Sequence, residues 1–359
     1  MPQLESLGWN DRLSSQYEPA EDGNSVPGRV AVQHRGAYDV LTEEGELRSE
    51  VVRRLVHEAA GPADLPVVGD WVVVVPGVED GTGTITAVLP RYTKFSRKTA
   101  WQATEEQVLA ANIDVAFLVA SMNEDLNLRR LERYLILAWE SGARPVIVLT
   151  KADLHPAPEA AVAEVETVAG GVPVLAISSV TGAGVEEMTS YLQPGVTAVL
   201  LGSSGVGKST IVNTLLGEEV LATQGLRNDG RGRHTTIRRE LIQLPGGGLI
   251  IDTPGIREVQ LWVADEGIDE AFDDITSLFS KCRFSDCAHD QEPGCAVRAA
   301  LADGTLSPER WDSYLKLQGE LAHLDRKIDK RAAAEERKRW KRIGQEGRER
   351  MRMKGTDKR

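Results

Sequence analysis

The stretch Gly202-Ser203-Ser204-Gly205-Val206-Gly207-Lys208-Ser209 decides the fold of this chain. An apolar run from Val196 to Leu201 precedes it, and a helical pattern from Thr210 to Leu216 follows it. A strand, a glycine-rich loop and a helix with the GxxxxGK[ST] spacing predict a phosphate-binding loop (P-loop). The glycines let backbone N–H groups turn inward around a phosphate, and the helix N-terminus adds its positive dipole end. The lysine can then reach the β- and γ-phosphates, and the Ser209 hydroxyl can ligate Mg²⁺.

The composition is that of an ordinary globular protein with an uneven distribution of charge. The chain has 359 residues, which allows two or three domains with real cores. Its formal net charge of −12 argues at first against a nucleic-acid partner. However, residues 326–359 hold 15 Lys and Arg against 6 Asp and Glu. This C-terminal tail therefore has a formal net charge of +9, and residues 1–325 have a formal net charge of −21. This asymmetry predicts that the tail binds a polyanion.

Cysteine usage and hydropathy favour a cytoplasmic protein. The three cysteines all fall between residues 282 and 295, and this odd number fits a reducing compartment better than a disulfide scaffold. The N-terminus has neither the basic start nor the apolar core of a signal peptide. No apolar run approaches the roughly 18–20 residues of a membrane span. We therefore expect no membrane contact, and we expect a monomer.

The first 98 residues predict an arm and a small barrel. Residues 1–25 are polar and have no period, so we expect a flexible arm. Residues 26–98 contain five short strand patterns punctuated by Gly and Pro, which favours an OB-fold. The expected strands are Gly28 to Val32, Ala37 to Leu41, Val51 to Leu55, Asp70 to Val75 and Thr84 to Leu89. The stretch from Arg91 to Lys98 mixes four cations with two aromatics, and either contacts RNA or forms a solvated interdomain linker.

From residue 113 the pattern changes to alternating strands and helices. Strands are expected at 115–120, 145–149, 172–177 and 196–201. The helices between them are expected at 128–138, 159–169 and 184–192. This alternation predicts a parallel sheet covered by helices on both faces.

Two motifs after the P-loop predict the rest of a triphosphate site. Asp252-Thr253-Pro254-Gly255 follows a predicted strand, 44 residues after Lys208. Its carboxylate can hold Mg²⁺ through water, and the Gly255 N–H can bond a γ-phosphate. A long glycine-rich loop ends in Arg231-Gly232-Arg233-His234-Thr235-Thr236, where a threonine hydroxyl could complete the Mg²⁺ shell. Thr235 and Thr236 cannot be separated from the sequence.

Two further motifs predict recognition of guanine. Thr150-Lys151-Ala152-Asp153 ends an expected strand and resembles the [NT]KxD signature. The Asp carboxylate can accept hydrogen bonds from guanine N1–H and N2–H₂, which adenine cannot offer, so Asp153 argues against an ATPase. Ser178-Ser179-Val180-Thr181-Gly182 ends the next strand and can offer backbone N–H groups to guanine O6.

These motifs define the expected site residues. The GTP-binding residues are Thr150, Lys151, Asp153, Ser178, Ser179, Gly202, Ser203, Ser204, Gly205, Val206, Gly207, Lys208, Ser209, Thr210 and Gly255. The magnesium ligands are Ser209, Asp252 and Thr235 or Thr236. In most P-loop GTPases the base motifs follow the P-loop, but here they precede it, which indicates a circular permutation. The Asp252 loop then leads directly into the C-terminal part of the chain.

The C-terminal part contains a candidate metal site. Cys282-x4-Cys287-x-His289-x5-Cys295 offers three thiolates and one imidazole, which match a tetrahedral Zn²⁺ site. Four protein ligands leave no open position, so the metal would be structural. A buried thiol cluster and a redox pair are the alternatives.

Together these motifs resemble the family of circularly permuted, small-ribosomal-subunit-dependent GTPases (RsgA/YjeQ). The resemblance covers roughly residues 27 to 320 and lies in the OB-fold, the permuted GTPase motifs and the Cys₃His spacing. It implies GTP hydrolysis with Mg²⁺, one structural Zn²⁺, stimulation by the small ribosomal subunit, contact with its rRNA and a role in late maturation of that subunit. The expected domains are an arm (1–25), an OB-fold (26–98), a permuted GTPase domain (99–265), a helical zinc-binding domain (266–325) and a basic tail (326–359).

The resemblance also bears on catalysis. Ile256 follows the Asp252 motif, where an apolar side chain cannot orient water, and the resemblance points instead to His234. An imidazole can position or polarise the attacking water if its loop folds over the γ-phosphate. Arg231 or Arg233 could instead supply charge to the transition state, and His234 could instead touch RNA.

Two other functions remain open from the sequence. One is a permuted GTPase that acts on the large subunit, against which the OB-fold and the position of the zinc domain argue. The other is an RNA-binding assembly checkpoint in which GTP only sets affinity. The rate of GTP hydrolysis, measured with and without ribosomal subunits, would discriminate among these functions.

Overall fold

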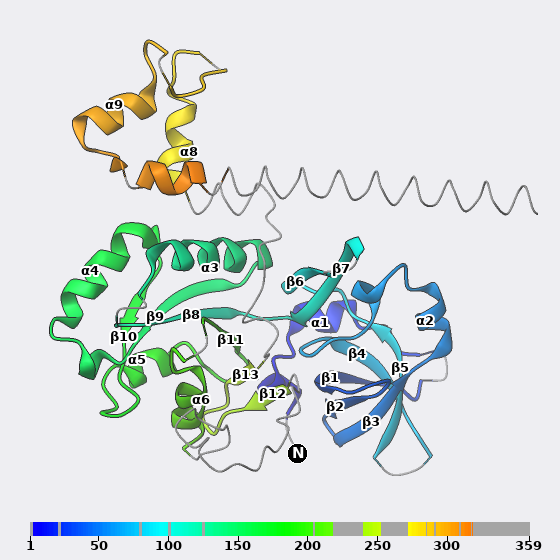
Figure 1. The fold of residues 1–359 in the computed structure, drawn as a ribbon. Coiled ribbons are helices and arrows are strands. Elements are labelled where there is room, and N and C mark those ends of the chain that lie inside the picture. The colour runs from blue at the N-terminus through cyan, green and yellow to red at the C-terminus, as the bar shows by residue number, and fades with distance from the viewer. Residues whose placement is uncertain are drawn as a thin grey trace, which may run out of the picture.

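The computed structural model describes residues 3–20, 23–78, 81–99, 102–123, 126–203, 205–217, 240–252, 272–284, 286–290, 292–308, 310–316 and 318. They form a barrel, a central sheet flanked by helices, and a C-terminal unit, by which we mean the described residues between 272 and 318 (Figure 1). None of the helices in this described part is both long and apolar enough to cross a membrane.

The N-terminal barrel has five strands, the number that the sequence predicts, and four of them lie where they were expected. They are β1 (Val26–Gln33), β2 (Tyr38–Thr42), β3 (Gly45–Val51), β4 (Trp71–Pro76) and β5 (Thr82–Val88). Their order is β1-β2-β3-β5-β4, and β1 pairs with β4 to close the barrel. Only β3 and β5 are parallel, and helix α2 (Arg53–Glu58) and turn η2 (Pro62–Asp64) connect β3 to β4. The closed five-stranded barrel confirms the expected fold class.

The third predicted strand was misplaced. The sequence prediction put it at residues 51–55, because Val51 and Val52 favour extended backbone. In the structure β3 ends at Val51 and α2 begins at Arg53. The reason is the pairing of β2 with β3, in which Thr42 lies opposite Gly45, so a two-residue turn sets where β3 starts.

The N-terminal residues differ from the expected flexible arm. They contain the turn η1 (Leu4–Leu7) and the helix α1 (Asp11–Gln16). Leu7 and Leu13 are completely buried, and the ring of Trp9 packs edge-on against Trp71 at 4.9 Å between centroids. The few apolar residues of this segment therefore form part of the core shared with the barrel, which a search for periodicity could not detect.

A hairpin of β6 (Lys94–Thr99) and β7 (Gln102–Ala111) follows the barrel. The expected boundary between residues 98 and 99 falls in this hairpin, and the division into domains stays a prediction. Arg91, in the stretch expected to be an RNA contact or a linker, instead donates two hydrogen bonds of 2.7 Å to the buried carboxylate of Asp70. Arg91 therefore holds the segment between η2 and β4, because it also donates to the carbonyls of Ala63 and Leu65.

The central sheet has the order β10-β9-β8-β11-β13-β12, and β12 is antiparallel to its neighbour. Its strands are β8 (Val115–Ser121), β9 (Arg144–Thr150), β10 (Val174–Ala176), β11 (Thr197–Leu201), β12 (Glu240–Gln243) and β13 (Leu249–Asp252). Helices α3 (Leu128–Ser141) and α4 (Pro158–Ala169) cover one face, and α5 (Val185–Thr189) and α6 (Lys208–Leu216) cover the other (Figure 1). This is the predicted α/β arrangement.

The three parts are joined by packing and pairing. Val32 of β1 pairs with Glu240 of β12, so the barrel and the central sheet share a hydrogen-bonded edge. The C-terminal unit contains α8 (Asp273–Phe279), α9 (Ala296–Asp303) and further helical residues at 310–316. It lies over the outer side of α3 (Figure 1), and Ile136 of that helix is completely buried in its core. Helix α3 therefore packs against the sheet on one side and the C-terminal unit on the other.

Candidate functional site

The carboxyl ends of the parallel strands meet at one edge of the central sheet. Ser121 at the end of β8 lies opposite Thr150 at the end of β9, and Leu201 at the end of β11 lies opposite Leu118. Ligands bind at this edge in open α/β sheets. The P-loop, the base motif and Asp252 all begin here, because each follows directly from one of these strands.

The P-loop leaves β11 at Gly202, where no other residue fits. Its φ is +156°, and an added Cβ would lie 2.3 Å from the carbonyl oxygen of Val119. Gly207 has a φ of +101° and directly precedes α6, which begins at Lys208. The Lys208 ammonium donates hydrogen bonds of 2.7 Å and 2.5 Å to the carbonyls of Gly202 and Ser203. These contacts fix the cation beside the loop that would surround a phosphate.

The structure brings the base motif onto the P-loop, across more than 50 residues of sequence. The Thr150 hydroxyl donates to the Val206 carbonyl at 2.6 Å. Lys151 has a φ of +60°, and its ammonium donates to the Gly205 carbonyl at 3.3 Å. Asp153 follows in the short turn η3 (Ala152–Leu154) with an exposed side chain. Thr150 and Lys151 thus shape the P-loop, and the Asp153 carboxylate faces solvent where a base can reach it.

The second base motif is a tight loop organised by Ser178. This residue is buried, and its hydroxyl accepts hydrogen bonds from the N–H groups of Val180 and Thr181 at 3.3 Å and 3.1 Å. Its carbonyl accepts from the Gly182 N–H at 2.9 Å. The Ser178 hydroxyl is therefore used to hold the loop, and the neighbouring Ser179 is half-buried.

The magnesium candidates are only partly described. Ser209 is the second residue of α6, directly after Lys208, and Asp252 is the last residue of β13. Strands β11 and β13 are parallel with Val199 opposite Ile251, so Asp252 lies at the same edge as the start of the P-loop. Ser204, His234, Thr235, Thr236 and Gly255 lie outside the described residues.

One neighbour of the P-loop was missed in the sequence analysis. Arg130, in the first turn of α3, donates a 3.0 Å hydrogen bond to the Ser203 hydroxyl. Asn127 caps this helix, because its side chain accepts from the Arg130 N–H at 3.1 Å. A single arginine in a helical pattern carries no signal for a contact with a residue 73 positions away.

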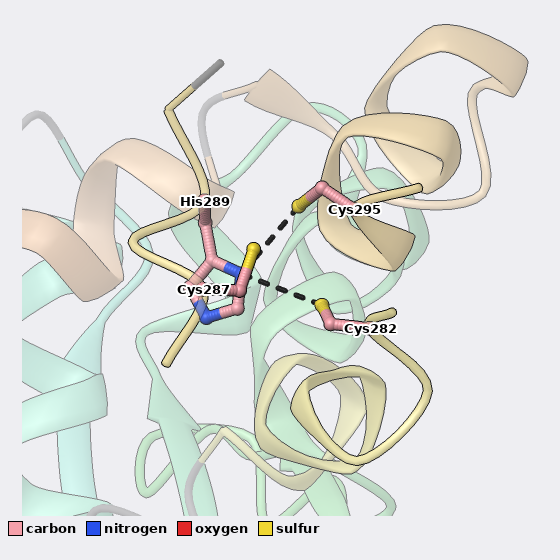
Figure 2. Close-up of side chains that lie close together, drawn as sticks. All are labelled: Cys282, Cys287, His289 and Cys295. Atoms are coloured by element: carbon pink, nitrogen blue, oxygen red, sulfur yellow. Dashed lines mark hydrogen bonds between the residues drawn. The ribbon is translucent and has the colours of Figure 1, made fainter. Parts of the chain in front are cut away.

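The Cys₃His cluster forms the second candidate site. The ligand atoms of Cys282, Cys287, His289 and Cys295 all lie within 4.8 Å of one another. Figure 2 shows His289 Nδ1 directed at two of the sulfurs, which are 3.6 Å (Cys282) and 3.5 Å (Cys295) away. Tetrahedral zinc with the usual bond lengths would place nitrogen and sulfur about 3.5 Å apart. The cluster therefore fits Zn²⁺ bound through Nδ1.

The surroundings of the cluster shift the pKa values of three of its residues in different directions. Burial raises the pKa of Cys282, but hydrogen bonds from the N–H groups of Ala296 and Val297 and from the side chains of Cys287 and Cys295 together outweigh it, so the pKa lies below the ordinary value. Burial raises the pKa of the Cys287 thiol to about 11. Burial lowers the pKa of His289, which favours the neutral ring that a metal requires. The ring of Phe279 stacks on His289 at 4.3 Å between centroids and fixes its orientation.

The fold and these sites define the class of protein. The chain has a closed five-stranded barrel and an α/β P-loop domain whose base motifs precede the P-loop. It also has a C-terminal unit with a Cys₃His cluster that fits zinc. These features define a circularly permuted P-loop GTPase. The RsgA GTPase family model matches residues 88–262. The chain is 48% identical to the small ribosomal subunit biogenesis GTPase RsgA of Opitutus terrae, over 98% of this chain and 99% of that protein. It therefore belongs to the RsgA GTPase family, and it is a GTPase.

Further comparisons agree with this assignment. The protein of the same name from Streptomyces coelicolor is 46% identical, over 98% of this chain and 95% of that protein. The crystal structure of YjeQ from Thermotoga maritima matches with a TM-score of 0.65 and 27% identity, over 83% of this chain and 99% of that one. YloQ, described as a circularly permuted GTPase, shares the fold with a TM-score of 0.61 at 24% identity, over 86% and 98% of the two chains.

Proposed function

We propose that this chain hydrolyses GTP to GDP and phosphate in the biogenesis of the small ribosomal subunit, and that the subunit stimulates the hydrolysis. The observation that supports this most is the identity of 48% with a relative named for that role, which spans both chains almost completely. Because the match includes the barrel and the C-terminal unit, it supports the ribosomal role as well as the nucleotide chemistry.

The nucleotide site is proposed to work as follows. The P-loop backbone surrounds the phosphates, and Lys208 neutralises part of their charge. Asp153 accepts hydrogen bonds from the guanine edge, while the backbone of Ser179 faces its O6. Ser209, Asp252 and one of Thr235 and Thr236 would hold Mg²⁺, which would stabilise negative charge on the phosphates when bound.

Hydrolysis is proposed to be an in-line attack of water on the γ-phosphorus. Ile256 occupies the position after the Asp252 motif, so intrinsic turnover should be slow. His234 would position the water once its loop folds over the γ-phosphate. Arg231 and Arg233 remain alternatives that would stabilise transition-state charge.

The remaining parts are proposed to dock the protein on rRNA during late maturation in the cytoplasm. The barrel, the C-terminal unit with one structural Zn²⁺, and the tail of +9 offer three separate contacts. The protein would act there as a monomer. Loss of the γ-phosphate contact at Gly255 would then release it from the subunit.

The test is GTP hydrolysis by the purified chain, alone and with purified small or large ribosomal subunits. We expect strong stimulation by the small subunit only. Equal turnover in all three reactions would contradict the ribosomal role, and stimulation by the large subunit would reassign it.

A further inference from the structure

Helix α3 contacts the P-loop with one side of its first turns and the C-terminal unit with the other. We propose that α3 couples the position of the C-terminal unit to the conformation of the P-loop. Arg130 is the positioning residue on the side of the P-loop, and Glu132 is the positioning residue on the side of the C-terminal unit. The inference rests on the nucleotide site proposed above and adds a regulatory contact to it.

The first contact fixes the beginning of the P-loop. The Arg130 guanidinium donates to the Ser203 hydroxyl at 3.0 Å, while the Lys208 ammonium donates to the Ser203 carbonyl at 2.5 Å. Ser203 is thus held from the helix and from within the loop. A shift of α3 would pull on the residue that follows the sharp turn at Gly202.

The space between α3 and the P-loop is small and is lined by both apolar and polar side chains. Asn127, Arg130 and Ser203 line a cavity of about 10 Å³ together with Ser121. The Ser121 hydroxyl is buried and finds no hydrogen-bond partner among the described residues. A cavity of this size can hold about one water molecule, which would link β8, α3 and the P-loop through hydrogen bonds.

The second contact ties α3 to the C-terminal unit through buried charges. Glu132 and Arg310 are 4% and 8% exposed, and Arg310 Nη1 donates to Glu132 Oε1 at 2.7 Å. The hydroxyl of Ser313 donates to the other carboxylate oxygen. Arg310 also forms two hydrogen bonds with Asp274 at 3.1 Å and 3.0 Å, and its guanidinium lies 4.2 Å from the ring centroid of Phe272.

The geometry of a helix explains how one element makes both contacts. Residues two apart differ by about 200° around the axis, so Arg130 and Glu132 point to nearly opposite sides. Because a packed helix moves as a rigid unit, a displacement of α3 at the C-terminal unit also moves the side of α3 that contacts the P-loop. Removing the charge of Glu132 would leave Arg310 with an incompletely paired buried charge and would loosen the C-terminal unit.

The first experiment uses Glu132→Gln in the full-length chain with two measurements. Hydrogen exchange of residues 310–316 reports whether the C-terminal unit loosens, and titration with a fluorescent GDP analogue reports the P-loop. We expect faster exchange and a Kd raised by about fivefold, the lower end of ordinary allosteric coupling. Arg129→Ala changes an exposed side chain of the same helix and is the control, for which both values should stay at wild type.

A second experiment tests the route. Arg130→Ala should raise the Kd for GDP by about tenfold, and Arg130→Lys should restore part of the loss because a lysine can still donate to Ser203. In a Ser203→Ala background, Glu132→Gln should lose most of its effect on the Kd, because the two changes act through one contact.

Three results would overturn the inference. The first is a looser C-terminal unit with a wild-type Kd in Glu132→Gln, and the second is full additivity of Glu132→Gln with Ser203→Ala. The third is unchanged hydrogen exchange at residues 310–316 in Glu132→Gln, because the contact of Glu132 with Arg310 would then not hold the C-terminal unit in place. Failure of the proposed function looks different, since the wild-type chain itself would not bind the GDP analogue, and the inference would fall with it.

Discussion

At the scale of single residues, Gly202 is the position with the least freedom in the site. An added methyl group would lie 2.3 Å from the Val119 carbonyl oxygen, and the φ of +156° would strain it further. We predict that Gly202→Ala displaces the P-loop, lowers the free energy of unfolding by about 2 kcal/mol and weakens GDP binding more than tenfold. Thermal unfolding and a titration with a fluorescent GDP analogue measure the two effects.

Gly246→Ala is the matched control, because a Cβ there meets nothing within 4 Å and the φ is not positive. It should leave both values unchanged. Wild-type GDP affinity in Gly202→Ala would show that the loop can move aside without cost.

Asp153 is the residue that should select the base. We predict that Asp153→Asn lowers the affinity for GTP by about 100-fold and favours xanthosine triphosphate, because an amide can donate to the carbonyl that replaces the guanine amino group. Competition binding with both nucleotides measures the preference. Glu159→Gln, an exposed change at the start of α4, serves as the control, and an unchanged GTP preference in Asp153→Asn would remove the base assignment.

His234 lies outside the described residues, and its role stays a prediction from the sequence. We predict that His234→Ala reduces turnover stimulated by the small subunit by about 100-fold or more and leaves nucleotide affinity unchanged, because positioning of water acts mainly in the transition state. Single-turnover hydrolysis with small subunits present measures it. If His234→Ala keeps its stimulation while Arg231→Ala or Arg233→Ala loses it, an arginine has the catalytic role.

At the scale of elements, the loop from Cys282 to Cys295 has too few apolar residues to fold by itself, and its four ligands would be held by a metal. We predict that the purified chain contains one Zn²⁺ and that a strong chelator removes it. Removal should expose the backbone of α8 and α9 to hydrogen exchange while the central sheet stays protected. Elemental analysis and exchange mass spectrometry test both statements.

Asp290→Asn is the control for the metal, since its exposed carboxylate lies beside the ligands but outside the set that converges. Cys282→Ser should lose zinc and Asp290→Asn should retain it. A full complement of zinc in Cys282→Ser, or unchanged exchange after chelation, would contradict a structural metal at this cluster.

At the scale of the whole molecule, Arg29 joins three segments. It is completely buried, and its guanidinium donates to the carbonyls of Leu7, Gly69 and Asn112, the last two at 3.4 Å and 2.9 Å. Burial lowers the pKa of Arg29, because the charged form loses its hydration. The N-terminal segment, the barrel and the end of the β6–β7 hairpin are thus held by one side chain.

We predict that Arg29→Met lowers the free energy of unfolding by about 3 kcal/mol, because the buried Leu7 carbonyl loses its donor. The carbonyls of Gly69 and Asn112 each lose one of two donors, since they also accept from the Asn112 side chain and the Tyr92 hydroxyl. The N-terminal segment should become sensitive to protease while residues of the central sheet remain resistant. Arg35→Met, an exposed change in the same barrel, is the control. Equal melting temperatures for the two variants would show that the Arg29 contacts contribute nothing.

The sequence alone determined much of this protein, because local chemistry specifies it. The spacing of Gly202, Lys208 and Ser209 predicted the P-loop, and four ligands within fourteen residues predicted the metal cluster, which the structure places within 4.8 Å. Four of the five barrel strands and the alternating central sheet also followed from periodicity and turn residues, whereas the third barrel strand was placed at residues that include the start of α2. In each case the residues that matter lie close together in the chain.

Only the tertiary structure decided which distant residues meet. The burial of Leu7 and Leu13, the pairing of Arg91 with Asp70, and the two sides of α3 were not visible in any pattern. Glu132 and Arg310 lie 178 positions apart, and Arg130 and Ser203 lie 73 apart. Periodicity shows which face of an element is buried but not what buries it, because that depends on how the complete chain packs.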